Sequence, residues 1–167
     1  IRPRPLGAQP AKKTLKAGLI GCGGRGNGAA GDIQEAAKHL GTVEIRFVAL
    51  ADAFKDRMDG VRAGLTKQGH TIPDGSCFVG FDAYKKLCAA DLDVVLMATS
   101  PVFRPLHYAA AVAAGRHVFI EKPVAVDPVG CRAMLEAGKL AEQKKLSVVA
   151  GTCLRHSPGY AATRKVV

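Results

Sequence analysis

The chain has 167 residues, and a hydrophobic fraction of 48% is enough to build the core of one ordinary domain, which excludes wholesale disorder. No apolar run approaches the roughly 20 residues that cross a bilayer, so no membrane partner is expected. The 24 basic and 14 acidic residues give a net charge of +10. The basic residues are spread over a tail, helices and turns, without aromatic residues between them. We therefore expect a solvated basic surface and no nucleic-acid partner.

The N-terminal segment, residues 1–13, combines Pro3, Pro5 and Pro10 with basic residues. Proline at this density blocks helix and sheet, so the segment is predicted to be an extended basic arm. No signal peptide is visible, and a cytoplasmic location is expected. The sequence starts at Ile1, so export to the periplasm after removal of a leader is the alternative. The five cysteines lack C-x-x-C and zinc-finger spacing, which indicates small buried thiols and no metal site.

Beyond the arm, strands and helices are predicted to alternate. Strands are expected over 15–20, 43–51, 77–79, 93–98, 118–120 and 146–150, and helices over 29–40, 54–65, 82–88, 105–115, 128–138 and from 158 to the end. Asp82 and Asp127 are expected to cap the helices that follow them. This alternation predicts a doubly wound parallel α/β sheet over residues 14–150. Residues 151–167 are interpreted as the start of a connection to a second substrate domain outside this sequence.

A glycine-rich turn, Gly21-Cys22-Gly23-Gly24-Arg25-Gly26, follows the first predicted strand and opens the first helix. In this pattern the first glycine allows a tight turn and the second lets the backbone approach a pyrophosphate. The third lets helix and strand pack closely. Free N–H groups at the start of the helix face the phosphates. The context predicts a dinucleotide site, with a merely tight strand–helix turn as the alternative.

Asp52 ends the second predicted strand, where a carboxylate accepts hydrogen bonds from the ribose hydroxyls of an adenosine. The same charge would repel a 2′-phosphate, so NAD is favoured over NADP, although Lys55 and Arg57 would offset part of the repulsion. Asp52 can also cap the next helix, and the two roles are compatible. A methyltransferase shares glycines and such an acid, but its turn usually carries glycine where Arg25 stands.

Thr99-Ser100-Pro101 follows the strand over 93–98 and should therefore border the cofactor at the carboxyl edge of the sheet. Thr99 and Ser100 are candidates for contacts with the ribose or nicotinamide, and a capping turn is the alternative. His107 follows early in the next helix. It is included among the candidate cofactor residues, with a partly buried structural role as the alternative.

Glu121-Lys122-Pro123 follows the strand over 118–120 at the same edge. This position places an amine beside the cofactor, where Lys122 could orient a substrate hydroxyl or carbonyl or shuttle a proton. Arg155, after the last strand, is predicted to face this edge and to hold an anionic or hydroxyl-rich substrate. A surface ion pair is the alternative for Arg155.

Together these motifs resemble the Gfo/Idh/MocA oxidoreductases, the relatives of glucose–fructose oxidoreductase and inositol dehydrogenase. The most specific part of the resemblance is the run from Gly115 to Pro123. The resemblance implies an N-terminal Rossmann domain that binds NAD(H) or NADP(H), and a second α/β domain. It implies reversible hydride transfer at a secondary alcohol of a sugar or cyclitol. Lys122 matches a catalytic-site lysine of the family, whose Asp and His partners belong to the second domain.

The motifs are compatible with three functions. The first is the cofactor-binding domain of an NAD(P)-dependent sugar or cyclitol oxidoreductase, with Lys122 as its catalytic residue. The second follows a related branch of the family that hydrolyses glycosides through transient oxidation by retained NAD. The third is a non-catalytic nucleotide-binding module. A homo-oligomer is expected for the full-length protein, since some family members carry an N-terminal arm that reaches a neighbouring subunit.

Overall fold

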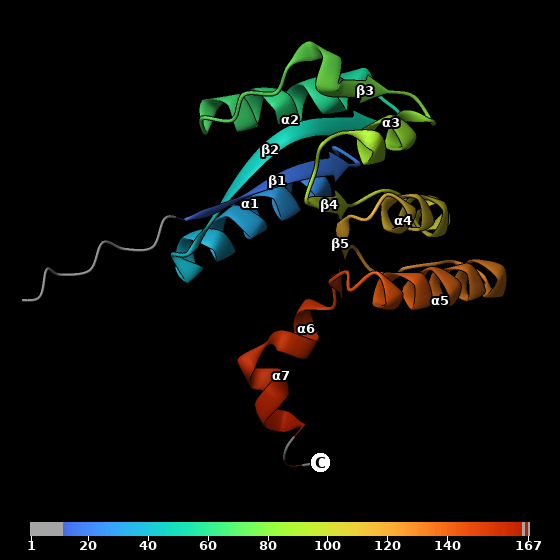
Figure 1. Cartoon of the computed structure of the whole chain (residues 1–167). Coiled ribbons are helices and arrows are strands. Elements are labelled where there is room, and N and C mark those ends of the chain that lie inside the picture. Colours follow the sequence, from blue (N-terminus) through green and yellow to red (C-terminus); the bar gives the residue numbers. More distant parts are fainter. Residues whose placement is uncertain (1–11, 165, 167) are drawn as a thin grey trace, which may run out of the picture.

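Six parallel strands form one sheet in the computed structural model, which describes residues 12–164 and 166 (Figure 1). The order across the sheet is β3-β2-β1-β4-β5-β6. The bounds of the strands are β1 Lys13–Ile20, β2 Val43–Asp52, β3 Cys77–Val79, β4 Val94–Met97, β5 His117–Ile120 and β6 Val148–Ala150. The order reverses between β1 and β4, and the crevice at such a reversal is where doubly wound sheets bind ligands.

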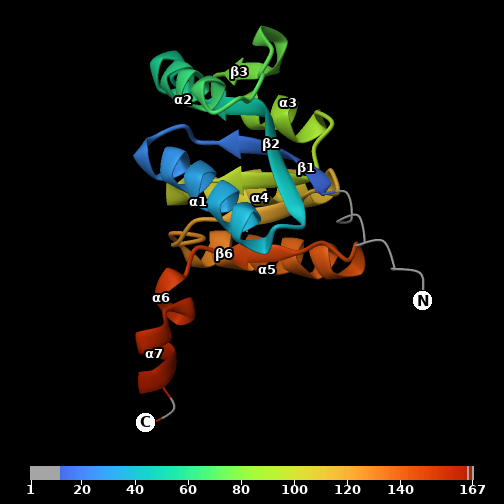
Figure 2. The same cartoon turned by 90° about the vertical axis from the view of Figure 1, so that its left-hand side faces the viewer.

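Helices cover both faces of the sheet (Figure 1). On one face lie α1 and α2, and on the other lie α3, α4 and α5; their bounds are α1 Gly24–Leu40, α2 Lys55–Lys67, α3 Ala83–Ala89, α4 Arg104–Ala113 and α5 Pro128–Gln143. Two short 3₁₀ turns, η1 Asp74–Ser76 and η2 Pro101–Phe103, lie in the connections. Beyond β6, α6 Cys153–His156 and α7 Pro158–Thr163 extend away from the sheet (Figure 2).

The two faces hold separate hydrophobic cores with the sheet between them. Leu19, Leu50 and Leu96 pack toward α1 and α2, and the small buried residues of α1 allow that helix to approach the sheet closely. Ile20 and Val95 pack toward α3, α4 and α5. Side chains alternate between the faces of a strand, so strands buried on both faces read as nearly continuous apolar runs. This burial explains why the sequence pattern predicted the strands well.

The fold class and the alternation of elements are confirmed, and the differences lie at element boundaries. The first strand begins at Lys13 rather than Leu15, because Lys13 pairs with Val43 of β2. Residues 1–11 of the predicted arm lie outside the described residues. The fourth helix begins at Arg104, just before the predicted Pro105, and follows the 3₁₀ turn η2.

Three further predictions need correction. The last predicted helix begins at Pro158 as expected but ends at Thr163, and a short helix that was not predicted, α6, precedes it. The side chain of Asp82 does not cap α3, because it forms an ion pair with Lys85 instead. The thiols are not uniformly buried, since Cys131 and Cys153 are exposed.

The Asp127 cap is confirmed, since its side chain accepts a hydrogen bond from the Gly130 N–H. Among the described residues, no helix has the length and hydropathy needed to cross a membrane.

Candidate functional site: a dinucleotide-binding edge

The turn between β1 and α1 leaves open space in front of two of its glycines. A Cβ added to Gly23 or Gly24 would meet no atom within 4 Å. The other two are tightly enclosed, because a Cβ on Gly26 would lie 1.8 Å from the Gly21 oxygen and one on Gly21 would lie 2.7 Å from the Thr99 nitrogen. Gly21 also has a φ of 91°, which side chains disfavour. The turn is thus closed toward the protein and open toward a ligand at the start of α1.

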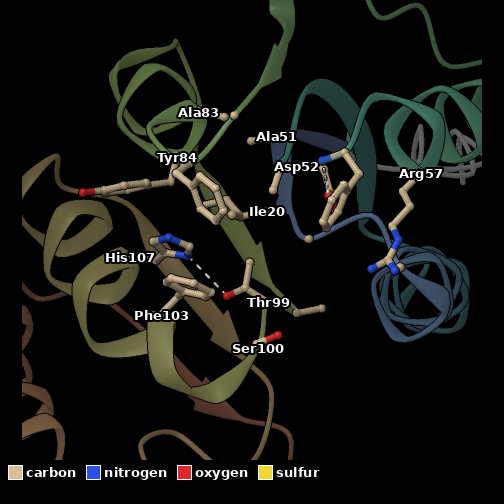
Figure 3. Close-up of a pocket in the computed structure, with 17 residues that line it drawn as sticks. Ile20, Ala51, Asp52, Arg57, Ala83, Tyr84, Thr99, Ser100, Phe103 and His107 are labelled. Carbon is tan, nitrogen blue, oxygen red and sulfur yellow. Dashed lines mark hydrogen bonds between the residues drawn. The ribbon is translucent and has the colours of Figure 1, made fainter.

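A first cavity of about 290 Å³ opens beside this turn, at the carboxyl ends of β1, β2, β3 and β4 (Figure 3). This volume is just below the roughly 300–1,000 Å³ that is usual for small-molecule sites. The cavity is lined by Ile20, Gly21, Gly23, Ala51, Asp52, Ala53, Phe54, Arg57, Gly80, Phe81, Ala83, Tyr84, Ala98, Thr99, Ser100, Phe103 and His107.

Asp52 is fixed in the wall of the first cavity by two backbone donors. Its Oδ2 accepts a hydrogen bond from the Cys22 N–H at 2.6 Å, and its Oδ1 accepts one from the Phe54 N–H at 2.9 Å. A carboxylate has about four acceptor positions, so two remain for a ligand. The contact with Cys22 places the carboxylate directly against the glycine-rich turn. Burial raises the pKa of the Cys22 thiol to about 12, so this side chain stays neutral there.

Arg57 of α2 lies on the same side of the cavity as Asp52, across from Thr99 and His107 (Figure 3). Its guanidinium carbon lies 5.0 Å from the centroid of the Phe54 ring, a cation–π arrangement. A positive charge therefore lies in the same cavity as the Asp52 carboxylate, consistent with the expectation that Arg57 would offset part of the repulsion of a 2′-phosphate.

His107 forms part of an aromatic wall opposite Asp52. Its ring centroid is 4.3 Å from that of Tyr84 and 6.0 Å from that of Phe103, and its Nδ1 lies 3.2 Å from Thr99 Oγ1. Burial lowers the pKa of His107 to about 4, so the ring is neutral near pH 7. The aromatic residues of this wall, Phe81 included, were not predicted from the sequence. Phe81 follows β3 closely and Phe103 lies in the turn after β4, and these positions beyond strand ends were the available signal, because ligands bind there.

A second cavity, of about 530 Å³, lies between α1 and the sheet face of β4, β5 and β6, and reaches the segments that follow β5 and β6. Its rim carries Arg25, Glu121 and Lys122. Lys122 is exposed, whereas only 5% of Glu121 is accessible to solvent. The structure thus places the predicted catalytic lysine on a different cavity from Asp52, with the glycine-rich turn contributing to both.

Arg104 connects the loops at the ends of β4 and β5. The buried guanidinium donates from Nε to the Thr99 carbonyl at 2.8 Å and from Nη1 to the Pro123 carbonyl. Burial lowers the pKa of Arg104. This residue was not singled out from the sequence, because its acceptors are backbone carbonyls, which no side-chain motif marks.

The remaining predicted residues take different positions. Ser100 lines the first cavity and Pro101 follows it at the start of η2. Arg155 lies on α6 and borders a separate hollow with residues of α7, so the structure does not bring it to either cavity. Within the described residues, no group of three His, Cys, Asp or Glu side chains is arranged to hold a metal ion.

A parallel sheet of this order, with a glycine-rich turn at the reversal and a carboxylate at the end of β2, defines a dinucleotide-binding Rossmann domain. The chain belongs to the Gfo/Idh/MocA oxidoreductase family, since the model of that family, described as an oxidoreductase family with an NAD-binding Rossmann fold, matches residues 15–151. This membership confirms the predicted resemblance, and NAD is the cofactor that the family description names.

Two curated relatives represent two activities. An inositol 2-dehydrogenase of Pseudomonas fluorescens is 33% identical over 122 residues, which is 73% of this chain and 33% of that protein. Glycosyl hydrolase family 109 protein 1 of Bacteroides thetaiotaomicron is 35% identical over 119 residues, or 70% of this chain and 24% of that protein. The chain therefore matches only about a third or a quarter of the length of these relatives.

Solved structures share the fold. An NAD-binding oxidoreductase from Klebsiella pneumoniae aligns with a TM-score of 0.73 and 23% identity, covering 92% of this chain and 38% of that one. Scyllo-inositol dehydrogenase from Lactobacillus casei, solved with NAD(H) and scyllo-inositol, aligns with a TM-score of 0.72 and 23% identity, covering 92% and 41%. At these identities the likeness establishes the fold alone.

Proposed function

We propose that this chain is the nucleotide-binding part of an NAD-dependent dehydrogenase that acts on a secondary alcohol of a cyclitol or sugar. The observation that carries the proposal is the position of the Asp52 carboxylate, 2.6 Å from the Cys22 nitrogen of a turn that is open in front of Gly23 and Gly24. The inositol 2-dehydrogenases among the relatives support the substrate class. A cytoplasmic location and assembly into a homo-oligomer stay predictions.

The residues present fit an adenine dinucleotide. The open side of Gly23 and Gly24 would receive the pyrophosphate at the start of α1, where free N–H groups bind anions. The remaining acceptor positions of Asp52 suit the two ribose hydroxyls of NAD. A 2′-phosphate would meet the Asp52 charge, and Arg57 would offset only part of the repulsion. These contacts favour NAD over NADP.

Bound NAD would supply the hydride acceptor at its nicotinamide ring. The second cavity, on the other side of the glycine-rich turn, is the natural place for the nicotinamide half and the substrate, because dinucleotides span the crevice of such sheets. There Lys122 would donate a hydrogen bond to the substrate oxygen at the reacting carbon, and would thereby orient the substrate. The hydrogen bond from Arg104 to the Thr99 carbonyl would hold the loop after β4 in place.

Calorimetric titration with NAD and NADP tests the cofactor assignment. We expect NAD to bind more tightly, and Asp52→Asn to weaken NAD binding by about 10–100-fold, the loss typical of a charge-assisted contact. The same substitution should narrow the preference for NAD over NADP. Asp56→Asn, which removes an exposed charge from the first turn of α2, is the matched control and should bind as the parent does. A folded protein with no affinity for either dinucleotide would refute the proposal.

A kinetic experiment tests the role of Lys122. The full-length protein, supplied with NAD and either myo-inositol or scyllo-inositol, should form NADH. Lys122→Met should lower kcat by at least about 100-fold, in the range of a lost acid–base group, while NAD affinity stays within a few-fold. Lys67→Met, at the exposed end of α2, is the control. If Lys122→Met turns over substrate as fast as the parent, Lys122 does not take part in the reaction.

Glycoside hydrolysis is the second candidate, because the glycosyl hydrolase relative is 35% identical over 119 residues. Release of nitrophenol from nitrophenyl glycosides without net formation of NADH would favour this function. Formation of NADH in proportion to oxidised polyol would favour the dehydrogenase. A protein that binds NAD and does neither with these substrates would support the non-catalytic module.

A further inference from the structure

An arginine of the glycine-rich turn reaches across the sheet edge to the residue before Lys122. Arg25 Nε donates to Glu121 Oε1 at 2.7 Å, and Glu121 Oε2 accepts the backbone N–H of Lys122 at 3.1 Å. A continuous set of contacts therefore runs from the first turn of α1 through one carboxylate to the backbone of Lys122. Bonds of this kind, with an ionised partner, are about twice as strong as neutral ones.

The Glu121 carboxylate is held in place by its surroundings. Only 5% of the residue is exposed, and a Cβ on Gly151 would lie 2.8 Å from the carboxylate carbon and from both oxygens. The backbone after β6 thus closes one side of the carboxylate, and a larger residue at position 151 would displace it. A buried carboxylate in this position needs its cationic partner, because an unpaired buried charge is strongly destabilising.

The second partner of Arg25 has a different character. Arg25 Nη2 lies 2.7 Å from Asp32 Oδ2, but the Asp32 side chain is 70% exposed and belongs to the same helix. Exposed pairs contribute little. The contact with Glu121 is therefore the one that links the start of α1 to the segment after β5. Because Asp32 binds the same guanidinium, its substitution is a matched control.

We propose that Arg25 is a positioning residue, which acts through Glu121 to couple the phosphate-binding turn to the backbone of Lys122. Its backbone belongs to the turn that would receive a pyrophosphate, and its side chain ends on the carboxylate that holds the Lys122 N–H. Occupation of the turn is thereby transmitted to the residue proposed to orient the substrate. The inference rests on the proposed function, since it requires a nucleotide at the turn.

The experiment uses ADP, which carries the adenosine and pyrophosphate but no nicotinamide and so does not cover Lys122 directly. The readout is the amide resonance of Lys122 in ¹⁵N-labelled protein, at ADP concentrations that saturate each variant. In the parent, ADP should shift this resonance. In Arg25→Met and Glu121→Gln the shift should be lost, and in Asp32→Asn it should persist. Arg25→Lys, which keeps the charge, should recover part of it.

A second measurement needs no nucleotide. Exchange of the Lys122 amide with solvent should be faster by about tenfold in Arg25→Met than in Asp32→Asn, because its acceptor is no longer fixed. If Glu121→Gln does not fold, the Arg25 variants decide the question.

Three outcomes separate the coupling from the function on which it rests. An ADP-dependent shift of equal size in the parent and Arg25→Met would overturn the coupling. ADP binding to the parent without any response at Lys122 would overturn it as well, and would leave the nucleotide site intact. Failure of the folded parent to bind ADP would overturn both the coupling and the proposed function.

Discussion

His107 differs from the other predicted cofactor residues because aromatic rings surround it. Only 6% of the residue is exposed, and Tyr84 and Phe103 lie on its ring. The hydrogen bond with Thr99 is its polar contact in the cavity wall. Both interpretations made from the sequence, a cavity residue and a buried structural residue, therefore describe part of its environment. Because the ring is neutral, its hydrogen bond can fix the Thr99 side chain without placing a charge beside the nucleotide.

The pH dependence of stability follows from this burial. Folding lowers the pKa of His107 from 6.5 to about 4, so the unfolded chain binds the proton more tightly. The contribution of neutral His107 to stability is therefore fully present above about pH 6.5 and is lost as the pH falls toward 4. We expect His107→Gln to reduce this loss by about 1–3 kcal/mol between pH 7 and 4.5, measured by urea unfolding.

His39→Gln is the control for this prediction, since His39 is exposed at the end of α1. An identical pH profile for His107→Gln and the parent would show that His107 does not titrate as its burial implies.

At the scale of elements, the start of α1 packs closely against the glycine-rich turn. The Gly26 backbone lies so near Gly21 that no side chain fits between them, whereas Gly31 has open space around its Cβ position. Small residues, Ala29 and Ala30, continue the contact along the helix. The start of α1 is therefore fixed beside the turn, and its N–H groups are fixed with it.

Substitution of Gly26 and of Gly31 by alanine should have opposite effects on stability. Gly26→Ala places a Cβ 1.8 Å from the Gly21 oxygen, so the helix must shift, at a cost of about 1–3 kcal/mol or more. Gly31→Ala, inside the same helix without a clash, should stabilise by about 0.5–1 kcal/mol. Urea unfolding measures both. Equal effects at the two positions would contradict the packing of the turn.

The helix caps give a second matched pair. Asp127 accepts the Gly130 N–H at 2.6 Å, so Asp127→Ala should destabilise the protein by about 1 kcal/mol. Asp82 has the same position before α3 but only an exposed pair with Lys85, so Asp82→Ala should change stability by no more than about 0.5 kcal/mol. Thermal unfolding compares the two. A larger effect at Asp82 would mean that it caps α3 in solution.

For the whole molecule, the main feature is that the glycine-rich turn contributes to two cavities, the first across the strand-order reversal between β1 and β4 and the second beside β5 and β6. A dinucleotide that spans the crevice would contact loops after several strands. Since the two cores lie on opposite faces of this sheet, a ligand along its edge touches elements packed in both. Binding should therefore stabilise the domain as a unit.

NAD at about 100 times its dissociation constant should add about 2.7 kcal/mol to the free energy of unfolding. For a domain of this size the gain corresponds to a rise in Tm of roughly 5–10 °C. ADP should give most of the effect and nicotinamide mononucleotide little, because the first cavity and the turn are built into the sheet. Differential scanning calorimetry measures the shift. If Tm does not change at NAD concentrations that saturate binding in the calorimetric titration, NAD does not stabilise the domain as a unit.

The sequence by itself determined the elements and their order. Strands such as Val94–Met97 are buried on both faces and read as apolar runs, and Gly41 and Gly115 mark the ends of helices with left-handed backbone angles. These are properties of neighbouring residues, so they are visible locally. The glycine-rich turn and Asp52 could be placed at one edge because parallel strands end on the same side of a sheet.

Only the tertiary structure decided how the site residues are paired. Arg25 and Glu121 are 96 positions apart, and their contact depends on how α1 and β5 are placed in the sheet. The aromatic wall around His107 comes from α3, α4 and η2, which no local pattern brings together. The division of Asp52 and Lys122 between two cavities likewise follows from packing. Residue types and spacing specify local conformation, whereas long-range side-chain contacts are set by the strand order and the shape of the closed core.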